Sequence, residues 1–333
     1  MKKIFLLLLA VAASLTVWSR QDRQNIIFET DMGNDVDDAL AIDMLYKYHA
    51  EKRIDLMAVM LNKEGEFPPM YIDLLNTWYG QRRIPIGTSG RTGQSLVAGK
   101  NYTQVVVEET DPQGNPLYRR SISDYSKLPT AVELYRKLLA KAKDGSVTIV
   151  SVGFSTNLAR LLETGADKYS PLSGRELVAK KVSHLVAMVG HFTKANYAEY
   201  NVINDIPSCQ QVFNEWPTPI YCSGFEIGEN IRYPAASITG DFGWTPHHPI
   251  VDSYKSYLPK LEDRPTWDLT AVLYAIDPAD RFGISKAGRV TITPEGFSLF
   301  KPDPTGRHFY LTVNDQQRRQ ILDYFVKLIT RKP

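Results

Sequence analysis

The amino-acid sequence predicts an α/β protein built on an open, mostly parallel sheet with helices on both faces. Short apolar runs alternate with longer runs of helical period over residues 26–222. The predicted strands are strongly apolar, which is typical of strands covered on both sides. The 333 residues suffice for one large domain of this class or two of middle size. The expected architecture is therefore a Rossmann-like, doubly wound sheet.

The individual elements follow from the same alternation. Each predicted strand is a short run rich in Ile, Val, Leu or Phe, and each predicted helix has apolar residues three or four apart. In one predicted helix, for example, Leu134, Leu138 and Leu139 share a side. The strands are predicted at 26–28, 56–61, 84–86, 147–152, 182–189 and 219–222, and helical residues at 36–50, 70–79, 130–143, 158–162 and 209–214.

The carboxyl-terminal part of the chain has a different pattern. Two β-rich runs, 290–292 and 297–300, flank Pro294-Glu295-Gly296 and predict a small hairpin. A run of helical period at 314–329 predicts a final helix. The doubly wound sheet is therefore expected to end with a hairpin and a helix.

Two regions interrupt the alternation of strands and helices. Residues 91–128 are polar and contain Gly, Asp and Pro, with one β-like run at 105–107. Residues 231–266 contain Pro, His and Trp and have no clear period. We interpret both regions as insertions or active-site loops.

The first residues have the order of a secretory signal peptide. Lys2 and Lys3 precede an apolar run at residues 4–13, and small residues follow. The run is too short for a good membrane span. We therefore expect a signal peptide at residues 1–19 and a single domain at residues 20–333. The mature protein is expected to be exported, periplasmic or extracellular, and not attached to a membrane.

Composition and charge exclude several classes of protein. Hydrophobic residues make up 43% and charged residues 23%, which excludes a disordered, collagen-like or coiled-coil chain. The net charge of +2 leaves no basic surplus for binding nucleic acid over a broad surface. Cys209 and Cys222 are the only cysteines, so one disulfide is possible, although two buried free thiols are favoured.

The most informative stretch joins the first predicted strand to the first helix. Asp31, Asp35, Asp37 and Asp38 fall within eight residues at the edge where doubly wound sheets bind ligands. A helix N-terminus stabilises one carboxylate by roughly 0.3–1 kcal/mol, which does not offset repulsion among four. A calcium ion would offset it, and Gly33 would let the backbone turn around the ion. A solvated helix start with Asp as its cap is the alternative.

Several segments resemble the inosine–uridine-preferring nucleoside hydrolase family. The stretch Glu29-Thr30-Asp31-Met32-Gly33-Asn34-Asp35-Val36-Asp37-Asp38-Ala39 is similar to the family fingerprint Asp-Thr-Asp-Pro-Gly-x-Asp-Asp-Ala, with two additional residues. Either Asp35 or Asp37 can therefore take one of the family's roles. Further matches follow in the family's order and extend the resemblance over residues 26–276. They are Asn62, 72–76, 84–87, Ser151 to Ala159, Ala198-Glu199-Tyr200-Asn201 and Trp267 to Val272.

The resemblance implies a nucleoside hydrolase fold and calcium-dependent hydrolysis of the N-glycosidic bond of a nucleoside or related N-riboside. Asp31 is implied to be the general base that activates a calcium-bound water. Relatives are commonly homo-oligomers. The implied calcium ligands are Asp31, Asp35, Asp38, the carbonyl of Val152 and Asp268, and the implied sugar-binding residues are Asp37, Asn62, Glu199 and Asn201.

The residue expected to contact the leaving base differs from the family pattern. The purine- and pyrimidine-acting relatives often have a His where this chain has Trp267. An indole can stack on a base, but it cannot donate a proton as a general acid near neutral pH. We expect His191, at a strand end, to be the replacement acid, with His247, His248 and His308 as further candidates.

Two alternative functions use the same residues. A non-catalytic binding protein would keep the calcium and sugar pocket without turnover, and the missing His favours this reading. The retained metal ligands and Asp31 count against it. A metal-dependent glycosyltransferase would use Asp35-Val36-Asp37 as an Asp-x-Asp motif, but that reading leaves the later matching segments unexplained.

Overall fold

The computed structural model describes residues 23–90, 102–278 and 280–333. Ten strands form the main sheet: β1 (Gln24–Thr30), β2 (Ile54–Leu61), β3 (Ile86–Gly87), β4 (Val147–Ser151), β5 (Val182–Met188), β6 (Ile220–Ser223), β9 (Gly283–Ile284), β10 (Gly288–Ile292), β11 (Ser298–Pro302) and β12 (His308–Thr312). Their order is β11-β10-β12-β6-β5-β4-β1-β2-β3, with β9 beside β12. All neighbours from β3 to β12 are parallel, and β9, β10 and β11 pair antiparallel. The mostly parallel sheet that the sequence predicts is therefore confirmed.

Strand β1 lies at the point where the two halves of the sheet diverge. Phe28 of β1 is opposite Val59 of β2 on one side and Val150 of β4 on the other. The chain continues from β1 into the half that contains β2 and β3, and it returns through β4 to build the other half. Doubly wound sheets bind ligands in the crevice beyond the strand ends at this kind of switch point.

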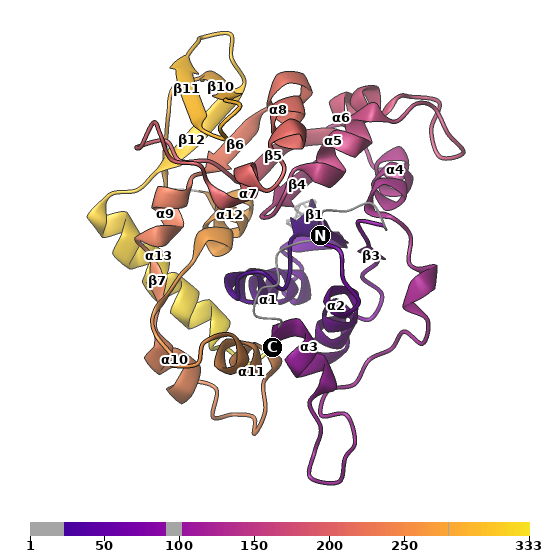
Figure 1. Ribbon diagram of the computed structural model, residues 1–333, viewed down its shortest axis with the longest axis vertical. Helices are drawn as coiled ribbons and strands as arrows, with labels where there is room; N and C mark the ends of the chain where they lie inside the picture. Colours follow the sequence, from indigo (N-terminus) through magenta and orange to yellow (C-terminus); the bar gives the residue numbers. More distant parts are fainter. Residues whose placement is uncertain (1–22, 91–101, 279) are drawn as a thin grey trace, which may run out of the picture.

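Helices cover both faces of the sheet (Figure 1). Side chains alternate between these faces along β1, because Ile26 and Phe28 join one hydrophobic core and Ile27 joins the other. The first core includes α1 (Asp37–Ala50), α2 (Phe67–Trp78), α12 (Trp267–Ile276) and α13 (Asp315–Ile329), and the second includes α4 (Ala131–Lys141), α5 (Thr156–Glu163), α6 (Gly174–Lys181) and α8 (Ile206–Glu215). The remaining helices are α3 (Tyr102–Glu108), α7 (Tyr200–Ile203), α9 (Phe225–Glu229), α10 (Ala235–Gly240), α11 (Pro249–Tyr257) and a 3₁₀ turn at Tyr125–Lys127.

The carboxyl-terminal elements confirm the predicted hairpin and final helix. Strands β10 and β11 pair around the turn at Pro294-Glu295-Gly296. Helix α13 begins with a capping box, in which Asn314 and Gln317 each accept the other's backbone N–H. Strand β12, which was not predicted, lies between this hairpin and β6 and is parallel to β6.

Both irregular regions contain regular secondary structure, and one interpretation, the β-like run, was wrong. The β-like run at 105–107 lies within helix α3, where Val106 and Val107 are buried. Helix α3 packs against α2 and α11, so tertiary packing outweighs the strand preference of three valines. The region at 231–266 contains α10, α11 and the short paired strands β7 (Arg232–Tyr233) and β8 (Arg264–Pro265). Residues 91–101 lie outside the described residues.

The remaining predictions about the chain concern its cysteines and its first residues. Cys209 and Cys222 are both buried free thiols, as favoured. The predicted signal peptide lies outside the described residues. Within the described ranges, no helix combines the length and apolar character that crossing a membrane requires.

Candidate active site

A cavity of about 310 Å³ opens beyond the carboxyl ends of β1, β4 and β5. It lies at the switch point, next to the loop from β1 to α1 and the start of α12. The sequence predicted ligand binding at this edge of the sheet. The lining residues are Asp31, Asn34, Asp35, Asp37, Asp38, Val152, Met188, Glu199, Tyr200, Asn201, Phe225, Tyr257, Trp267 and Asp268.

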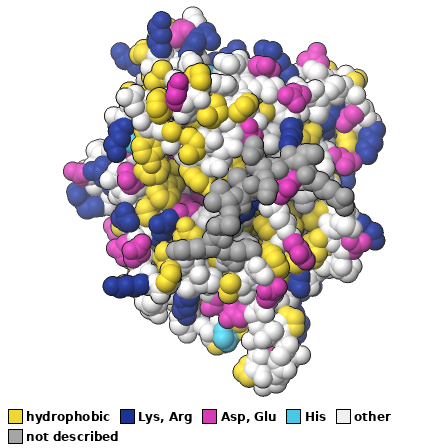
Figure 2. Space-filling model, in the orientation of Figure 1, with side chains coloured by type: hydrophobic (Ala, Val, Ile, Leu, Met, Phe, Trp, Pro, Cys, Tyr) yellow, Lys and Arg dark blue, Asp and Glu magenta, His cyan; other side chains and the backbone are white. Residues whose placement is uncertain are grey.

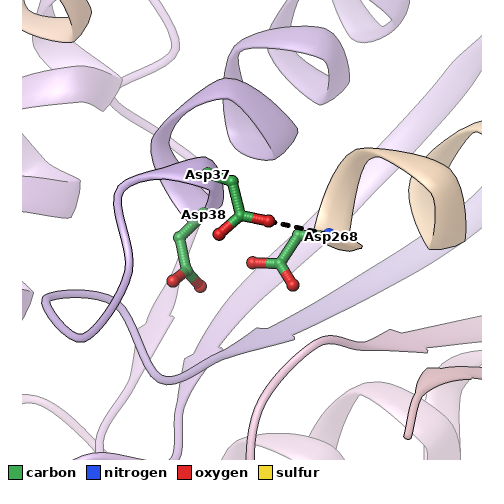
Figure 3. A group of neighbouring side chains, drawn as sticks. All are labelled: Asp37, Asp38 and Asp268. Atoms are coloured by element: carbon green, nitrogen blue, oxygen red, sulfur yellow. Dashed lines mark hydrogen bonds between the residues drawn. The ribbon is translucent and has the colours of Figure 1, made fainter. Parts of the chain in front are cut away.

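Three aspartates meet at the base of two helices in this cavity. Asp37 and Asp38 occupy the first turn of α1, and Asp268 occupies the first turn of α12. Each offers a carboxylate oxygen, and these oxygens lie within 4.8 Å of one another. The backbone N–H of Asp268 donates to Asp37 at 3.0 Å and ties the two helix starts together (Figure 3). Residues distant in the sequence therefore form one acidic cluster.

The acidic cluster is electrostatically unfavourable without a cation. Burial raises the pKa values of the Asp37, Asp38 and Asp268 carboxyl groups well above their usual range. Repulsion from neighbouring carboxylates raises these pKa values further. Among the described residues, no hydrogen-bond donor reaches the Asp268 carboxylate. Three buried carboxylates with spare acceptor capacity form a donor set that fits a hard divalent cation.

Asp31 lies beside the acidic cluster in the loop after β1. Its carboxylate is buried and accepts a hydrogen bond from the Asn34 side chain at 2.5 Å. Burial is the main cause that raises the pKa of Asp31 to about 6. Gly33 makes the turn possible, because its φ of +105° is strained for residues with a side chain. The loop therefore holds Asp31 at the cavity wall, as predicted from the sequence.

Asp35 and Asp37 both line the cavity but contact different groups. Asp35, expected among the metal ligands, forms an ion pair with Arg264, whose Nε donates to it at 3.1 Å. Asp37, expected to bind the sugar, is a member of the acidic cluster with Asp38. The partner Arg264 is 229 residues away from Asp35, and no feature of the acidic stretch identifies it.

The residues expected to bind the sugar fall into two groups. Glu199 and Asn201 line the cavity, and the Asn201 side chain donates to the carbonyl oxygens of Val152 and Met188, each at 3.1 Å. Burial raises the pKa of Glu199 to about 7. Asn62 is fully buried and is not among the lining residues. Its side chain donates to the carbonyl of Phe154 at 2.9 Å.

Aromatic side chains form another wall of the cavity. Trp267 and Phe225 have ring centroids 5.1 Å apart, and the indole N–H of Trp267 donates to the Phe225 carbonyl at 3.0 Å. Tyr257 and Tyr200 also line the cavity. Of these aromatic residues, only Trp267 was predicted from the sequence. Phe225 had a usable signal, because it comes two residues after a strand at the ligand-binding edge, but Tyr257 had none.

The predicted replacement acid, His191, lies behind this aromatic wall. Its ring is 1% exposed and stacks on Phe225 at 5.9 Å between centroids, and it is not among the lining residues. Burial is the main cause that lowers its pKa, and the Glu226 carboxylate lies 3.3 Å from its Nδ1. His248 caps α11 and His308 lies in β12, and neither lines the cavity.

Two residues that were not predicted from the sequence, Thr30 and Lys63, contact the loop that carries the acidic residues. The Thr30 hydroxyl donates to the Asp38 carboxylate and accepts the N–H of Met32 at 3.0 Å. Lys63 donates to Asn34 at 2.6 Å, which places a positive charge near Asp31. These contacts orient the loop from β1 to α1 around the carboxylates.

Comparisons with known proteins identify the family to which these features correspond. The sequence model described as "Inosine-uridine preferring nucleoside hydrolase" matches residues 26–321. A comparison with curated proteins finds no match.

Solved structures share the fold at low sequence identity. A plant nucleoside hydrolase has 20% identity and a TM-score of 0.68, and the match covers 93% of this chain and 99% of that one. An inosine–uridine preferring nucleoside hydrolase from Bacillus anthracis has 17% identity and a TM-score of 0.66, with 92% and 99% covered. The type III effector protein XopQ, solved with adenosine diphosphate ribose, has 13% identity and a TM-score of 0.62, with 93% of each chain covered.

Proposed function

The chain belongs to the inosine–uridine preferring nucleoside hydrolase family, and we propose that it hydrolyses the N-glycosidic bond of nucleosides or related N-ribosides with calcium as its metal. The observation that carries this proposal is the buried cluster of Asp37, Asp38 and Asp268 beside the cavity. The cavity volume of about 310 Å³ is at the lower end of the range for small-molecule sites.

The proposed metal site uses oxygen ligands from three parts of the chain. Asp37, Asp38 and Asp268 would hold calcium, with Asp31 and the Val152 carbonyl as further ligands from the same cavity. Carboxylate and carbonyl oxygens are the ligands that calcium prefers. Bound there, calcium would supply an oriented water molecule of increased acidity.

The side chains around the cluster account for the other parts of the reaction. Asp31 would accept the proton that water loses as it adds to C1′ of the sugar, and Asn34 keeps its carboxylate oriented. Glu199 and Asn201 would hold the sugar hydroxyls from the start of α7. The transition state carries positive charge on the sugar, and a cavity lined by carboxylates stabilises that charge.

The test is the release of sugar from inosine and uridine by the mature protein, with calcium and after chelation. We expect calcium-dependent release in the native protein and at least about a thousandfold loss in Asp38→Asn, because one ligand and one charge are removed. Asp315→Asn is the matched control, because Asp315 is an exposed aspartate at the start of α13. Calcium binding measured by calorimetry separates metal loss from loss of turnover.

Protein that binds calcium but releases no sugar from any riboside would contradict the hydrolase proposal. It would favour a second function, a non-catalytic calcium- and sugar-binding protein. The specific observation behind this second function is that His191 lies behind Phe225, while Trp267 lines the cavity instead. Measured affinity for ribosides without turnover is its signature.

Two further properties of the mature protein are proposals from the sequence. We propose that it is exported to the periplasm or the medium and that it forms a homo-oligomer. Amino-terminal sequencing of the exported protein tests the first property. Light scattering coupled to size-exclusion chromatography tests the second.

A further inference from the structure

The cavity has two chemically different walls. Oxygen atoms of Glu199, Asn201 and the acidic cluster of Asp37, Asp38 and Asp268 form one wall. These groups suit the hydroxyls of a sugar. The other wall is aromatic, and it suits the flat ring that leaves when the N-glycosidic bond breaks. A bound N-riboside would therefore place its leaving group against the aromatic wall.

The aromatic wall is held in place by contacts within the chain. The Trp267 indole N–H is committed to the Phe225 carbonyl at 3.0 Å, so it is not free to donate to a base. Gly228 lets the start of α12 approach closely, because a Cβ at this position would lie 2.3 Å from the Trp267 Cα. Trp267 and Phe225 therefore present ring surfaces rather than hydrogen-bond donors.

The described residues of the aromatic wall also provide no acid that is suited to protonating a leaving group. Phe225 and Trp267 have no acidic proton, and burial raises the pKa values of Tyr200 and Tyr257 further above neutral pH. His191 is on the far side of Phe225. A neutral base becomes a good leaving group when it gains a proton, whereas a cationic ring leaves as a neutral molecule without one.

The charge of the cavity favours a cationic ring. Six acidic side chains line it, and no lysine, arginine or histidine is among the described lining residues. Arg264 lies over two rings of the aromatic wall, 5.4 Å from the Tyr257 ring centroid and 5.6 Å from that of Trp267. Its ion pair with Asp35 offsets one of the six acids, so five acidic side chains remain to attract a cationic ligand. Aromatic rings in an acidic, partly desolvated site attract cations.

We infer that the preferred substrates are N-ribosides whose leaving ring is cationic, such as pyridinium ribosides and N7-alkylated purine ribosides, and this inference rests on the proposed hydrolase function. The bond between C1′ and the ring nitrogen breaks, and both of its electrons remain on that nitrogen. The ring departs neutral. Water adds its oxygen to C1′ and releases one proton to Asp31, which passes it to solvent. The positive charge of the substrate thus leaves as a proton.

The test compares kcat/KM for nicotinamide riboside, 7-methylinosine and inosine in calcium-loaded protein and in Trp267→Leu. The quantity to compare is the ratio of kcat/KM for a cationic substrate to kcat/KM for inosine, and how this ratio changes on mutation. The ratio in the native protein alone is not sufficient, because cationic nucleosides are intrinsically more labile. We expect Trp267→Leu to lower kcat/KM about tenfold for the two cations and less than threefold for inosine. Trp267→His should raise the rate for inosine, because it supplies a proton donor. Trp244→Leu is the matched control, since Trp244 does not line the cavity.

A binding measurement gives a readout that does not depend on turnover. N-methylnicotinamide, a cation, should bind calcium-loaded protein at least tenfold more tightly than neutral nicotinamide, and Trp267→Leu should abolish the difference. If circular dichroism shows that Trp267→Leu is unfolded, the same binding comparison is made with Phe225→Leu.

The outcomes separate this inference from the proposed function. Calcium-dependent hydrolysis of inosine with equal losses for all substrates in Trp267→Leu would overturn the cationic preference and leave the hydrolase proposal intact. No ribose from any substrate, in protein that binds calcium, would overturn both. Selective loss for the cations supports the inference.

Discussion

Helix α1 buries aspartates in two places, and the charge is balanced differently in each. In its middle, buried Asp43 forms a 2.9 Å ion pair with buried Lys47. At its start, Asp37 and Asp38 face Asp268 in the acidic cluster, where the described residues include no ion pair to any of the three. The same helix therefore carries one charge that is neutralised within the chain and one group of charges that is not.

The difference distinguishes a structural acid from a functional one. A carboxylate neutralised inside the core needs nothing from outside and holds α1 in position. In a cluster that opens to a cavity, burial and repulsion oppose ionisation, and the donor set fits a cation from solvent. Position decides which case applies, since the start of α1 lies at the ligand-binding edge of the sheet and its middle does not.

The largest expected effect is at the acidic cluster. We expect Asp38→Asn to lower kcat/KM for nucleoside hydrolysis at least about a thousandfold while the chelated protein becomes more stable, because a repulsive charge is removed. Steady-state kinetics and thermal unfolding in a chelator check this. A variant that is both inactive and less stable than the native protein would place Asp38 among the structural acids.

The opposite result is expected at the neutralised pair. Asp43→Asn leaves the Lys47 ammonium buried without a counter-charge, and we expect it to lower the free energy of unfolding by about 3 kcal/mol. Calcium affinity and activity per folded molecule should not change. Denaturant unfolding measures the loss, and Asp43→Asn combined with Lys47→Met should recover part of it. A large drop in calcium affinity would contradict the separation of the two sites.

Calcium itself should stabilise only through the acidic cluster. At a calcium concentration about a hundred times its dissociation constant, linkage adds about 2.7 kcal/mol, which corresponds to a rise in Tm of about 5 °C for a chain of this length. Chelation should remove this gain in the native protein and in Asp43→Asn. In Asp38→Asn, calcium should leave the Tm almost unchanged. Differential scanning calorimetry decides between these results.

The smallest effect concerns His248, whose protonation is opposed by burial and by Lys47 of the neutralised pair. Burial lowers the pKa of His248 to about 3, with a further contribution from Lys47. The unfolded chain has a His pKa of about 6.5, so protons bind the unfolded state first as pH falls. We therefore expect neutral His248 to contribute fully to the free energy of unfolding above about pH 6.5. At pH 5 this free energy should be lower by about 2 kcal/mol, because the unfolded chain binds the proton more readily.

His248→Asn is the matched variant for this measurement. Asn keeps a side-chain acceptor for the Ile250 N–H at the start of α11, which His248 Nδ1 now provides. The difference in unfolding free energy between the native protein and the variant should decrease from pH 7 to pH 5. A difference that does not change with pH would show that His248 titrates normally in the folded protein.

Much of the candidate site was predictable because its acidic residues are close together in the sequence. A strand followed by Asp31, Gly33 and the pair Asp37-Asp38 specifies acids at a strand end, and the topology rule specifies that ligands bind there. Asp268 was predictable only through the resemblance to a family, since a single acid in a first helical turn is ordinary.

Other features of the site depend on contacts between distant residues. Asp35 pairs with Arg264 and Asp37 with the Asp268 backbone, and no local pattern distinguishes these two aspartates. The three valines of α3 prefer strand conformation, and packing against α2 and α11 reverses that preference. His191 follows a strand end, yet its ring turns behind Phe225 and away from the cavity lining.

The sequence alone determined the parallel α/β architecture, the edge of the sheet at which the cavity lies and the acidic character of that edge. These follow from hydrophobic periodicity and from residues that are close in the chain. Only the tertiary structure decided which aspartates face one another, which aromatic residues form the opposite wall and which histidine is shielded. Hydrophobic side chains also gather on the surface over α7 and α9 (Figure 2), where Tyr200 and Ile203 are exposed. The site depends on how α12 packs against both α1 and α9, because that packing sets the distances that govern charge and hydrogen bonding, and no single segment encodes it.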